Sequence, residues 1–259
     1  MSGSHELVRT KSGALAVRSV ADDEVMHPGV GPRVEAETLY VAQSRLAGRL
    51  AAAPLTLFDV GLGAGSNAFA ALAVAARAPH PLTLVSFERD LGALALALTQ
   101  PADFGIDAAT ATAAHELVRT GTDAAPHATW HLRHGELLPA LAGEPTRADV
   151  VFWDPFSPRA NPALWTVDAF AEMRRLANDR CTLFTYSAST ATRVAMLLAG
   201  WAVGAGDAIG DKRETTAAAV RVEDLARPLD ARFLARVRRS SAVLPEGAVE
   251  RLALLPQLR

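Results

Sequence analysis

The residues of this sequence best suited to chemistry stand in a run from Asp154 to Trp165, which reads Asp-Pro-Phe-Ser-Pro-Arg-Ala-Asn-Pro-Ala-Leu-Trp. The run follows the strand-like stretch 149–153, so we expect Asp154 at the carboxyl end of a strand. A carboxylate with nearby carbonyl oxygens can hold the hydrogens of an amine and leave its lone pair facing an electrophile. Phe156 can pack against a substrate or a positive charge. Asp154 and Phe156 are therefore the candidate catalytic residues; the alternative is a proline-shaped turn with Phe156 in the core.

A glycine-rich loop, Gly61-x-Gly63-x-Gly65, follows the strand-like residues 55–60 and precedes a predicted helix over 66–77. Glycine permits positive φ angles and lets a ligand approach the backbone, and a helix N-terminus offers free N–H groups. The spacing differs from the Gly-x-Gly-x-x-Gly fingerprint of dinucleotide-binding proteins, so an NAD-dependent oxidoreductase is the least favoured enzyme class. The loop predicts a ligand site; the alternative is a tight turn that binds nothing.

Glu88 stands at the end of the second strand-like stretch, 82–87, and 23 residues after Gly65. In open α/β sheets, ligands bind at the carboxyl ends of the strands, and an acidic side chain there can accept hydrogen bonds from ribose hydroxyls. Glu88 therefore predicts a cofactor that contains ribose, without identifying it. The alternative is a surface carboxylate paired with Arg89.

From residue 55 onward, strand-like stretches alternate with helical ones. Such alternation predicts a mostly parallel sheet with helices on both faces. The last two stretches, 201–205 and 215–222, predict an antiparallel pair at the edge of the sheet. The other expected strands are 55–60, 82–87, 129–133, 149–153 and 182–186, and the expected helices are 66–77, 90–100, 109–120 and 189–199.

Two extensions flank this alternating region. We expect residues 1–50 to form an N-terminal extension that caps the substrate side, with a helix over 33–50, and residues 223–259 to form a C-terminal helical extension. Residues 51–222 would form the ligand-binding domain, and the whole chain one structural domain. Six arginines lie between Arg221 and Arg239. This run is either a solvated helical face or a patch that contacts phosphates.

Composition narrows the classes of protein. A net charge of −2 argues against a strongly basic nucleic-acid binder as a whole. The longest apolar stretch, Ala68–Ala76, has about half the length that spans a membrane, and the N-terminus lacks the apolar core of a signal peptide. With one cysteine, Cys181, we expect a cytoplasmic location and no membrane partner. The histidine spacing matches no metal-ligand set, so no metal is expected.

The loop from Asp59 to Gly65 resembles the first motif of class I S-adenosylmethionine-dependent methyltransferases, and Asp154-Pro155-Phe156 resembles the Asp/Asn-Pro-Pro-Tyr loop of amino-group methyltransferases. The resemblance implies an α/β, Rossmann-like fold with a mostly parallel seven-stranded sheet, helices on both faces and an antiparallel edge strand. It also implies S-adenosylmethionine as cofactor and S-adenosylhomocysteine as product. The residues implied to bind the cofactor are Asp59, Gly61, Gly63, Gly65, Asn67, Glu88, Glu136 and Asp154. Glu136 would accept the adenine amino group, where Asp is more usual.

The run from Asp154 to Trp165 is similar to the Asp-Gly/Pro-Phe-Ala/Ser-Pro-x-x-Asn-Pro-x-x-Trp pattern of the methyltransferase domain in bacterial tRNA enzymes that make 5-methylaminomethyl-2-thiouridine. The segment Met26–Ala36 resembles stand-alone relatives of that domain. The resemblance implies N-methylation of the 5-aminomethyl group of the wobble uridine in tRNA, with Asp154 positioning the amine. The residues implied on the substrate side are His27, Pro155, Ser157, Asn161, Trp165, Lys212 and Arg213.

The resemblance also implies partners. Transfer RNA is one. The bifunctional enzymes carry an FAD-dependent oxidase domain that prepares the amine, for which 259 residues leave no room, so a separate FAD-dependent oxidase protein is another candidate. Two further functions stay open: transfer to a small amine, including aminopropyl transfer, and a non-catalytic S-adenosylmethionine-binding subunit of a tRNA-modification complex. The Asn161-Pro162-x-x-Trp165 continuation argues against aminopropyl transfer, and the intact Asp154 argues against a non-catalytic subunit.

Overall fold

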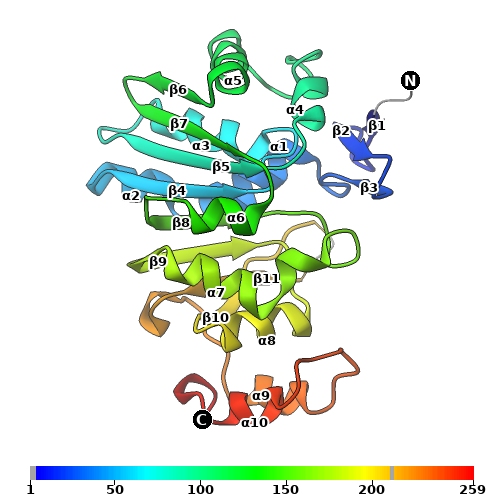
Figure 1. Ribbon diagram of the computed structural model, residues 1–259, viewed down its shortest axis with the longest axis vertical. Coiled ribbons are helices and arrows are strands. Elements are labelled where there is room, and N and C mark those ends of the chain that lie inside the picture. The colour runs from blue at the N-terminus through cyan, green and yellow to red at the C-terminus, as the bar shows by residue number, and fades with distance from the viewer. Residues whose placement is uncertain (1–3, 211–212) are drawn as a thin grey trace.

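The computed structural model describes residues 4–210 and 213–259. In these residues an eight-stranded sheet runs in the order β10-β11-β9-β8-β4-β5-β7-β6 (Figure 1). The five strands from β7 to β9 are parallel, and the pairs β6–β7, β9–β11 and β10–β11 are antiparallel. The strands are β4 (Leu55–Val60), β5 (Leu82–Glu88), β6 (Thr122–Ala125), β7 (Ala128–His134), β8 (Ala148–Trp153), β9 (Ala177–Thr185), β10 (Ala202–Gly206) and β11 (Thr215–Ala219).

The predicted fold class and the antiparallel edge pair are confirmed, but the expected number of strands was too low by one. The additional strand, β6, turns back on β7 and pairs Thr122 with His131 and Ala125 with Ala128. Its residues, Thr-Asp-Ala-Ala, are largely exposed and carry no apolar alternation. Because such alternation is the sequence signal for a strand, nothing in these residues predicted pairing.

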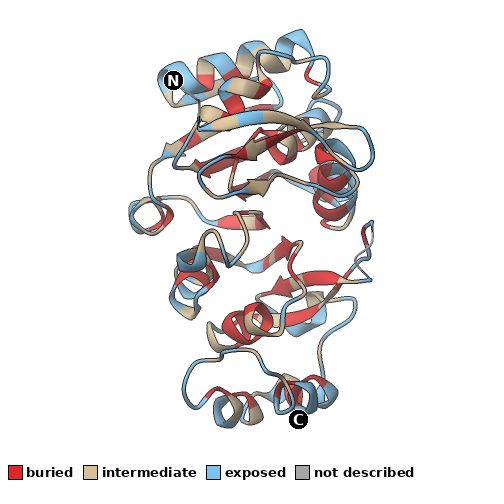
Figure 2. Ribbon diagram, turned by 90° about the vertical axis from the view of Figure 1, so that its right-hand side faces the viewer, coloured by how far each residue is buried: buried red, intermediate tan, exposed pale blue. Residues whose placement is uncertain are grey.

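Helices cover both faces of the sheet, as predicted. Successive β4 residues point to opposite faces: Leu57 belongs to one buried apolar cluster and Phe58 to the other. In Figure 2 much of the ribbon of the strands is coloured as buried. One layer holds α2 (Leu46–Ala52), α3 (Ser66–Ala75) and α5 (Ala108–Thr120); the other holds α6 (Leu137–Ala142), α7 (Val167–Arg175) and α8 (Thr190–Leu198), and α4 (Gly92–Ala97) lies near the strand ends.

The N-terminal segment adds a separate three-stranded antiparallel sheet at the carboxyl ends of the main strands (Figure 1). Its strands are β1 (His5–Arg9), β2 (Leu15–Ser19) and β3 (Glu24–Val25). The helix expected over 33–50 is interrupted: α1 (Pro32–Glu35) continues into a π-helix, η1 (Ala36–Ala42), and α2 starts only after Arg45, whose φ is 54°. A left-handed residue ends a regular helix, so one long helix is not formed.

The C-terminal residues 223–259 join the same core as the sheet. Helices α9 (Ala231–Val237) and α10 (Ala248–Ala253) bury Phe233 and Leu252 in the apolar cluster that also holds Trp201. The stretch before α9 covers β10: the Ala205 N–H donates to the Arg227 carbonyl at 2.9 Å. These contacts cover an edge that would otherwise expose unpaired backbone groups. Among the described helices, none has the length and apolarity to cross a membrane.

Candidate active site

The glycine loop brings the ends of β4 and β8 together. Gly61, Gly63 and Gly65 have φ angles of 87°, 52° and 88°. A Cβ on Gly61 would lie 2.7 Å from the carbonyl oxygen of Asp154, and a Cβ on Gly65 would lie 2.5 Å from the Phe69 ring. Only a residue without a side chain fits at either position. Gly61 and Gly63 line the adjacent pocket, whereas Gly65 faces the Phe69 ring instead.

Asp59 lies beneath this loop and off the pocket wall. Its carboxylate is fully buried; Oδ2 accepts a hydrogen bond from Ser86 Oγ at 2.9 Å, and Trp130 Nε1 in turn donates to Ser86 Oγ. Burial raises the pKa of Asp59 to about 7, because a dry surrounding disfavours the charged form. The structure therefore places Asp59 where it supports the loop from below rather than where a ligand would touch it.

Glu88 ties the end of β5 to the glycine loop. Its Oε2 accepts the Gly63 N–H at 2.9 Å, and its Oε1 accepts the N–H groups of Arg89 and Asp90 at 2.8 and 3.0 Å. A carboxylate has about four acceptor positions, so three are used within the protein. These bonds hold the Glu88 carboxylate in one orientation on the pocket wall.

A pocket of about 500 Å³ opens where β4, β5 and β8 end and where the N-terminal sheet faces them. Eight of its described lining residues are acidic, and Arg89 is the one arginine or lysine among them. Such a lining favours a ligand with positive charge. Four of the acids come from the N-terminal segment, namely Asp22, Asp23, Glu24 and Glu35. The other four stand at or near the strand ends, namely Glu88, Asp90, Glu136 and Asp154.

Asp154 is the most enclosed of the pocket acids that follow a strand. Its side chain is 7% exposed, and Oδ2 accepts a hydrogen bond from Asn67 Nδ2 at 2.7 Å. Burial raises the pKa of Asp154 to about 6, against the opposing effect of nearby His27. The hydroxyl of the buried Tyr40 makes no hydrogen bond of good geometry within the described residues. It still lies close enough to Asp154 to favour the charged form of that carboxyl group. Asn67 thus acts through Asp154 and does not line the pocket.

Aromatic residues support the loop that follows Asp154. Trp165 Nε1 donates to the Phe156 carbonyl at 2.8 Å, and the Tyr186 hydroxyl donates to the Pro155 carbonyl at 3.0 Å. The rings of Trp165 and Tyr186 meet edge to face at 5.6 Å. Phe156, Pro155 and Tyr186 line the pocket, whereas Trp165 is buried behind them. Trp165 therefore shapes the wall without facing a ligand.

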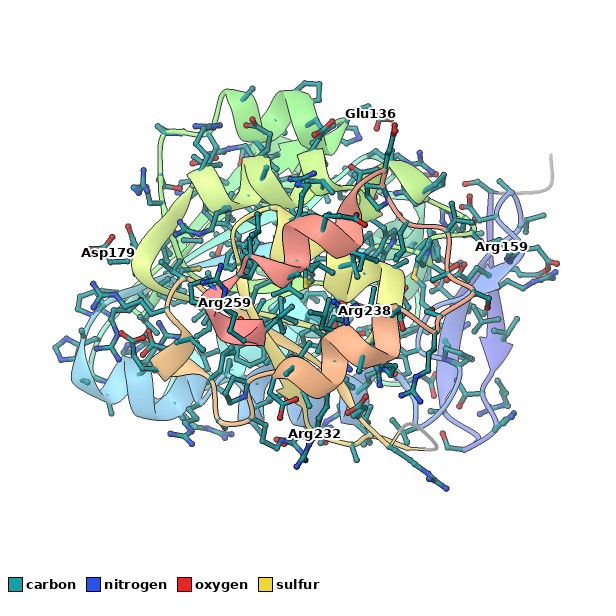
Figure 3. The ribbon with its side chains drawn as sticks, turned by 90° about the horizontal axis from the view of Figure 1, so that it is seen from below. Glu136, Arg159, Asp179, Arg232, Arg238 and Arg259 are labelled. Atoms are coloured by element: carbon teal, nitrogen blue, oxygen red, sulfur yellow. The ribbon has the colours of Figure 1, made fainter. Side chains whose placement is uncertain are left out.

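The N-terminal segment is fastened to the same loop. Glu24 accepts hydrogen bonds from the backbone N–H and the hydroxyl of Ser157 at 2.9 and 2.7 Å. Arg159 donates to the carbonyls of Asp22 and Asp23 at 3.4 Å (Figure 3 labels Arg159 beside the N-terminal strands). Ser157 is thus used in holding the cap in place, and it lies off the pocket wall.

Comparisons with known proteins give matches in both sequence and structure. A family profile described as S-adenosyl-L-methionine-dependent methyltransferase matches residues 113–221. The tRNA 5-methylaminomethyl-2-thiouridine biosynthesis bifunctional protein MnmC of Paraburkholderia phymatum is 28% identical over 250 residues, covering 90% of this chain and 36% of that protein. An uncharacterized protein of Methanocaldococcus jannaschii is 26% identical over 215 residues, covering 83% of this chain and 59% of that protein.

Solved structures show the same fold. MnmC2 from Aquifex aeolicus superposes with a TM-score of 0.70 at 23% identity, covering 99% of this chain and 77% of that one. Spermidine synthase from Thermotoga maritima superposes with a TM-score of 0.50 at 13% identity, covering 97% of this chain and 81% of that one.

The part of the chain that the profile matches, residues 113–221, is that of an S-adenosylmethionine-dependent methyltransferase. The chain as a whole is similar to MnmC, and it spans about a third of the length of the Paraburkholderia protein.

The pocket of this methyltransferase fits its cofactor chemically. S-adenosylmethionine carries a sulfonium and an ammonium, which the acidic lining would complement. Glu88 lines the pocket beside Gly61 and Gly63, which add no side chain to its wall, and contacts of these residues with the ribose and methionine parts stay predictions. Glu136 is exposed at the rim, as the N-cap residue of α6, and its side chain makes no capping bond (Figure 3). Among the described residues, no group of three or more His, Cys, Asp or Glu side chains is arranged so that it could hold a metal ion.

The predicted substrate residues are divided between the pocket and the surface. His27, Pro155 and Asn161 line the pocket. Arg213 is exposed and lies off the pocket wall, and Lys212 lies outside the described residues. Motif reading missed Glu24 and Glu35, because neither follows a strand of the main sheet. The match of Met26–Ala36 to stand-alone relatives was the available signal for Glu35, which lies within it.

Replacing Glu88 with Ala is expected to weaken S-adenosylmethionine binding by about 1–3 kcal/mol, because a charged acceptor for the ribose hydroxyls is lost. Calorimetric titration of the two proteins measures the difference. Glu172→Ala, which removes an acid paired with Arg175 on the surface of α7, is the matched control. Equal affinities in the Glu88 variant and the wild type would show that the ribose is held elsewhere.

Proposed function

We propose that this methyltransferase acts on nitrogen and that its acceptor is the 5-aminomethyl group of the wobble uridine in tRNA. The observation that carries the proposal is the enclosed carboxylate of Asp154, at the end of β8 and in a strongly acidic pocket. An amine is the acceptor that such a surrounding attracts. The similarity to MnmC along 90% of the chain supports the tRNA substrate, and a tRNA substrate implies a cytoplasmic location.

The geometry suits the steps of N-methylation. Asp154 would hold the N–H groups of the amine, while Asn67 and His27 fix the Asp154 carboxylate. Phe156 and Tyr186 would close the site against water around the reacting nitrogen. The cofactor supplies the methyl group, bonded to a positively charged sulfur. Holding the amine nitrogen with its lone pair toward that methyl group supplies the orientation that the reaction needs.

A tRNA substrate also needs contacts with phosphates. Of the six arginines from Arg221 to Arg239, three are paired: Arg221 with Asp179, Arg227 with Asp207, and Arg236 with Glu214. The other three, Arg232, Arg238 and Arg239, have no ion pair within the described residues. Figure 3 shows Arg232 and Arg238 on the C-terminal helices, away from Arg159 at the N-terminal sheet.

If these arginines contact phosphates, replacing Arg232, Arg238 and Arg239 together with Ala should lower tRNA affinity and flatten its salt dependence. Each lost phosphate contact reduces the slope of log K against log salt by about 0.9. Filter binding at several salt concentrations measures both quantities. An unchanged slope would leave the three arginines as a solvated helical face.

The test of the proposed function is methyl transfer from labelled S-adenosylmethionine to bulk tRNA from a strain that lacks this modification, with nucleosides identified by mass spectrometry. Label on the wobble 5-aminomethyl group would support both the chemistry and the substrate. It would also make a separate FAD-dependent oxidase, as supplier of the amine, the next partner to seek. Cofactor binding with no labelled nucleoside would contradict the tRNA proposal.

A second candidate acceptor is a small cationic amine, including the acceptor of an aminopropyl transfer. The acidic lining favours it, because eight carboxylates attract a compact cation and repel a polyanion at close range. The same labelled assay with diamines and polyamines separates the candidates. Transfer of label would support small-amine methylation, and consumption of decarboxylated S-adenosylmethionine would support aminopropyl transfer. If the protein binds the cofactor but transfers label to none of the acceptors tested, the result would support a non-catalytic subunit.

A further inference from the structure

His27 lies between two carboxylates at the inner end of the pocket. Its Nε2 is 3.6 Å from Asp154 Oδ2, and its Nδ1 is 3.6 Å from Glu35 Oε2. The three side chains are only 14%, 7% and 10% exposed, respectively. An imidazole has two nitrogens, so it can receive a proton on one side while a carboxylate steadies the ring on the other.

The local backbone is shaped to hold this arrangement. His27 has a φ of 52°, a strained conformation for a residue with a side chain, and such strain persists where the surroundings fix it. The Met26 N–H donates to the Val17 carbonyl at 2.9 Å, and the Met26 sulfur packs near Gly63. A short loop then leads into α1, which carries Glu35 back to the other side of the ring. Residues from two segments are therefore brought to one imidazole.

The chemistry of the proposed reaction needs a proton acceptor here. An alkylamine is an ammonium near pH 7, since amines of this type have pKa values of about 10. An ammonium has no lone pair and cannot be methylated. Asp154 can take one proton from it, but a protonated Asp154 no longer holds the amine by charge. A group beside Asp154 that removes the proton restores the carboxylate.

We propose that His27 receives the proton of the substrate ammonium through Asp154, and that Glu35 positions the ring and stabilises the imidazolium that forms. The proposal rests on the proposed N-methyltransferase function. The N–H bond of the ammonium breaks with its electron pair left on nitrogen, and the proton passes by way of Asp154 to His27 Nε2. The nitrogen lone pair then forms the N–CH₃ bond as the S–CH₃ bond breaks. Its electrons remain on sulfur, which gives S-adenosylhomocysteine and a secondary ammonium.

The groups around His27 favour this role. Asp154 faces it from the position after β8, Glu35 faces it from α1, and Asp59 in β4 interacts with it electrostatically. Tyr40 and Tyr186 interact with the same carboxylates from η1 and from the end of β9. All five are neutral or negative, so each charged neighbour stabilises an imidazolium.

The pH dependence of kcat tests the relay, because kcat reports groups that titrate in the enzyme–substrate complex. For His27→Gln we expect kcat to fall about 10- to 100-fold at pH 7 and to approach the wild type above about pH 10, where the amine loses its proton to solvent. For Glu35→Gln we expect a smaller fall and a rising limb displaced to lower pH, because the ring has lost a stabilising negative charge. His115→Gln and Glu172→Gln, both on surface helices, are the matched controls and should leave the profile unchanged.

The rising limb of the kcat profile should move to higher pH in His27→Gln and to lower pH in Glu35→Gln. A purely structural role would not move the two limbs in opposite directions. Equal losses for both variants at every pH, with no displaced limb, would overturn the relay. So would a wild-type kcat in His27→Gln at pH 7. A wild type that methylates no amine at any pH is instead a failure of the proposed function, and it is recognised before either variant is measured.

A second measurement tests the interaction between His27 and Glu35 without requiring catalysis. Proton NMR of the cofactor-bound protein follows the titration of the His27 ring, assigned by its loss in His27→Gln. Removal of the Glu35 charge should move this titration to lower pH, since a negative neighbour favours the charged ring. A titration unaffected by Glu35→Gln would overturn the proposal even if the enzyme methylates tRNA.

Discussion

Asp154→Asn is expected to lower kcat for methyl transfer by about 10²- to 10⁴-fold and to leave S-adenosylmethionine affinity within about twofold. The amide is nearly the same size as the carboxylate and can still accept the hydrogen bond from Asn67. It cannot, however, attract an ammonium by charge or accept its proton at neutral pH. Single-turnover measurement of methyl transfer gives the rate, and calorimetry gives the affinity.

The free energy of unfolding distinguishes the expected loss of kcat in Asp154→Asn from a folding defect. The pKa of Asp154 is raised to about 6 in the folded protein from an ordinary value near 3.8. Between these two pH values the folded state binds more protons than the unfolded state, so this group lowers stability as pH rises and leaves a constant deficit above pH 6. Removing its charge relieves the deficit, and Asp154→Asn should unfold in urea at pH 7 no more easily than the wild type. An unchanged rate in a folded variant would remove Asp154 from the mechanism.

The parts of the site that could be predicted from sequence depend on residues close together in the chain. The glycine loop, Glu88 and Asp154 each follow a strand-like stretch directly, and parallel strands bring their carboxyl ends to one edge. Local pattern and sheet topology were therefore enough to gather them. The pocket confirms their neighbourhood, since Gly61, Glu88 and Asp154 all line it.

The orientation of side chains was not available from the same patterns. Asp59 stands in a strand that is buried on both faces, so no alternation shows which side faces a ligand. Its side chain turns to Ser86 beneath the loop. Trp165 belongs to a specific motif, but its indole N–H supports the Phe156 carbonyl from behind. A motif identifies the residues of a site more readily than it separates those facing the ligand from those supporting them.

The cap was the least predictable part, because long-range contacts position it. Glu24 reaches Ser157 across 133 residues of chain, and the His27 ring meets Asp154 only after the N-terminal sheet has docked. The π-helix η1 and the left-handed Arg45 likewise have no clear sequence signal. The acidic character of the cap is plain in the sequence, yet its place over the pocket is a property of the tertiary fold.

Gly61→Ala is expected to destabilise the protein by about 2–5 kcal/mol and to lower kcat/KM by more than about tenfold. The positive φ of 87° costs a residue with a side chain about 1–2 kcal/mol. In addition, the new Cβ would lie 2.7 Å from the Asp154 carbonyl oxygen and 3.0 Å from Pro155 Cα, and overpacking of this kind costs about 1–3 kcal/mol. The backbone that must yield carries the Asp154 side chain, and a displacement of about 1 Å can cost 10²-fold in rate. Urea unfolding and steady-state kinetics measure the two effects.

Gly121→Ala isolates the backbone part of that effect. Gly121 ends α5 with a φ of 81°, nearly the same as that of Gly61, but a Cβ there meets no atom within 4 Å. Its substitution should cost only the conformational part, about 1–2 kcal/mol, and should leave kcat/KM unchanged. The difference between the two variants then measures the contact between β4 and the Asp154 backbone. Equal stability losses, with activity retained in Gly61→Ala, would show that the two strand ends can move apart without disturbing the carboxylate.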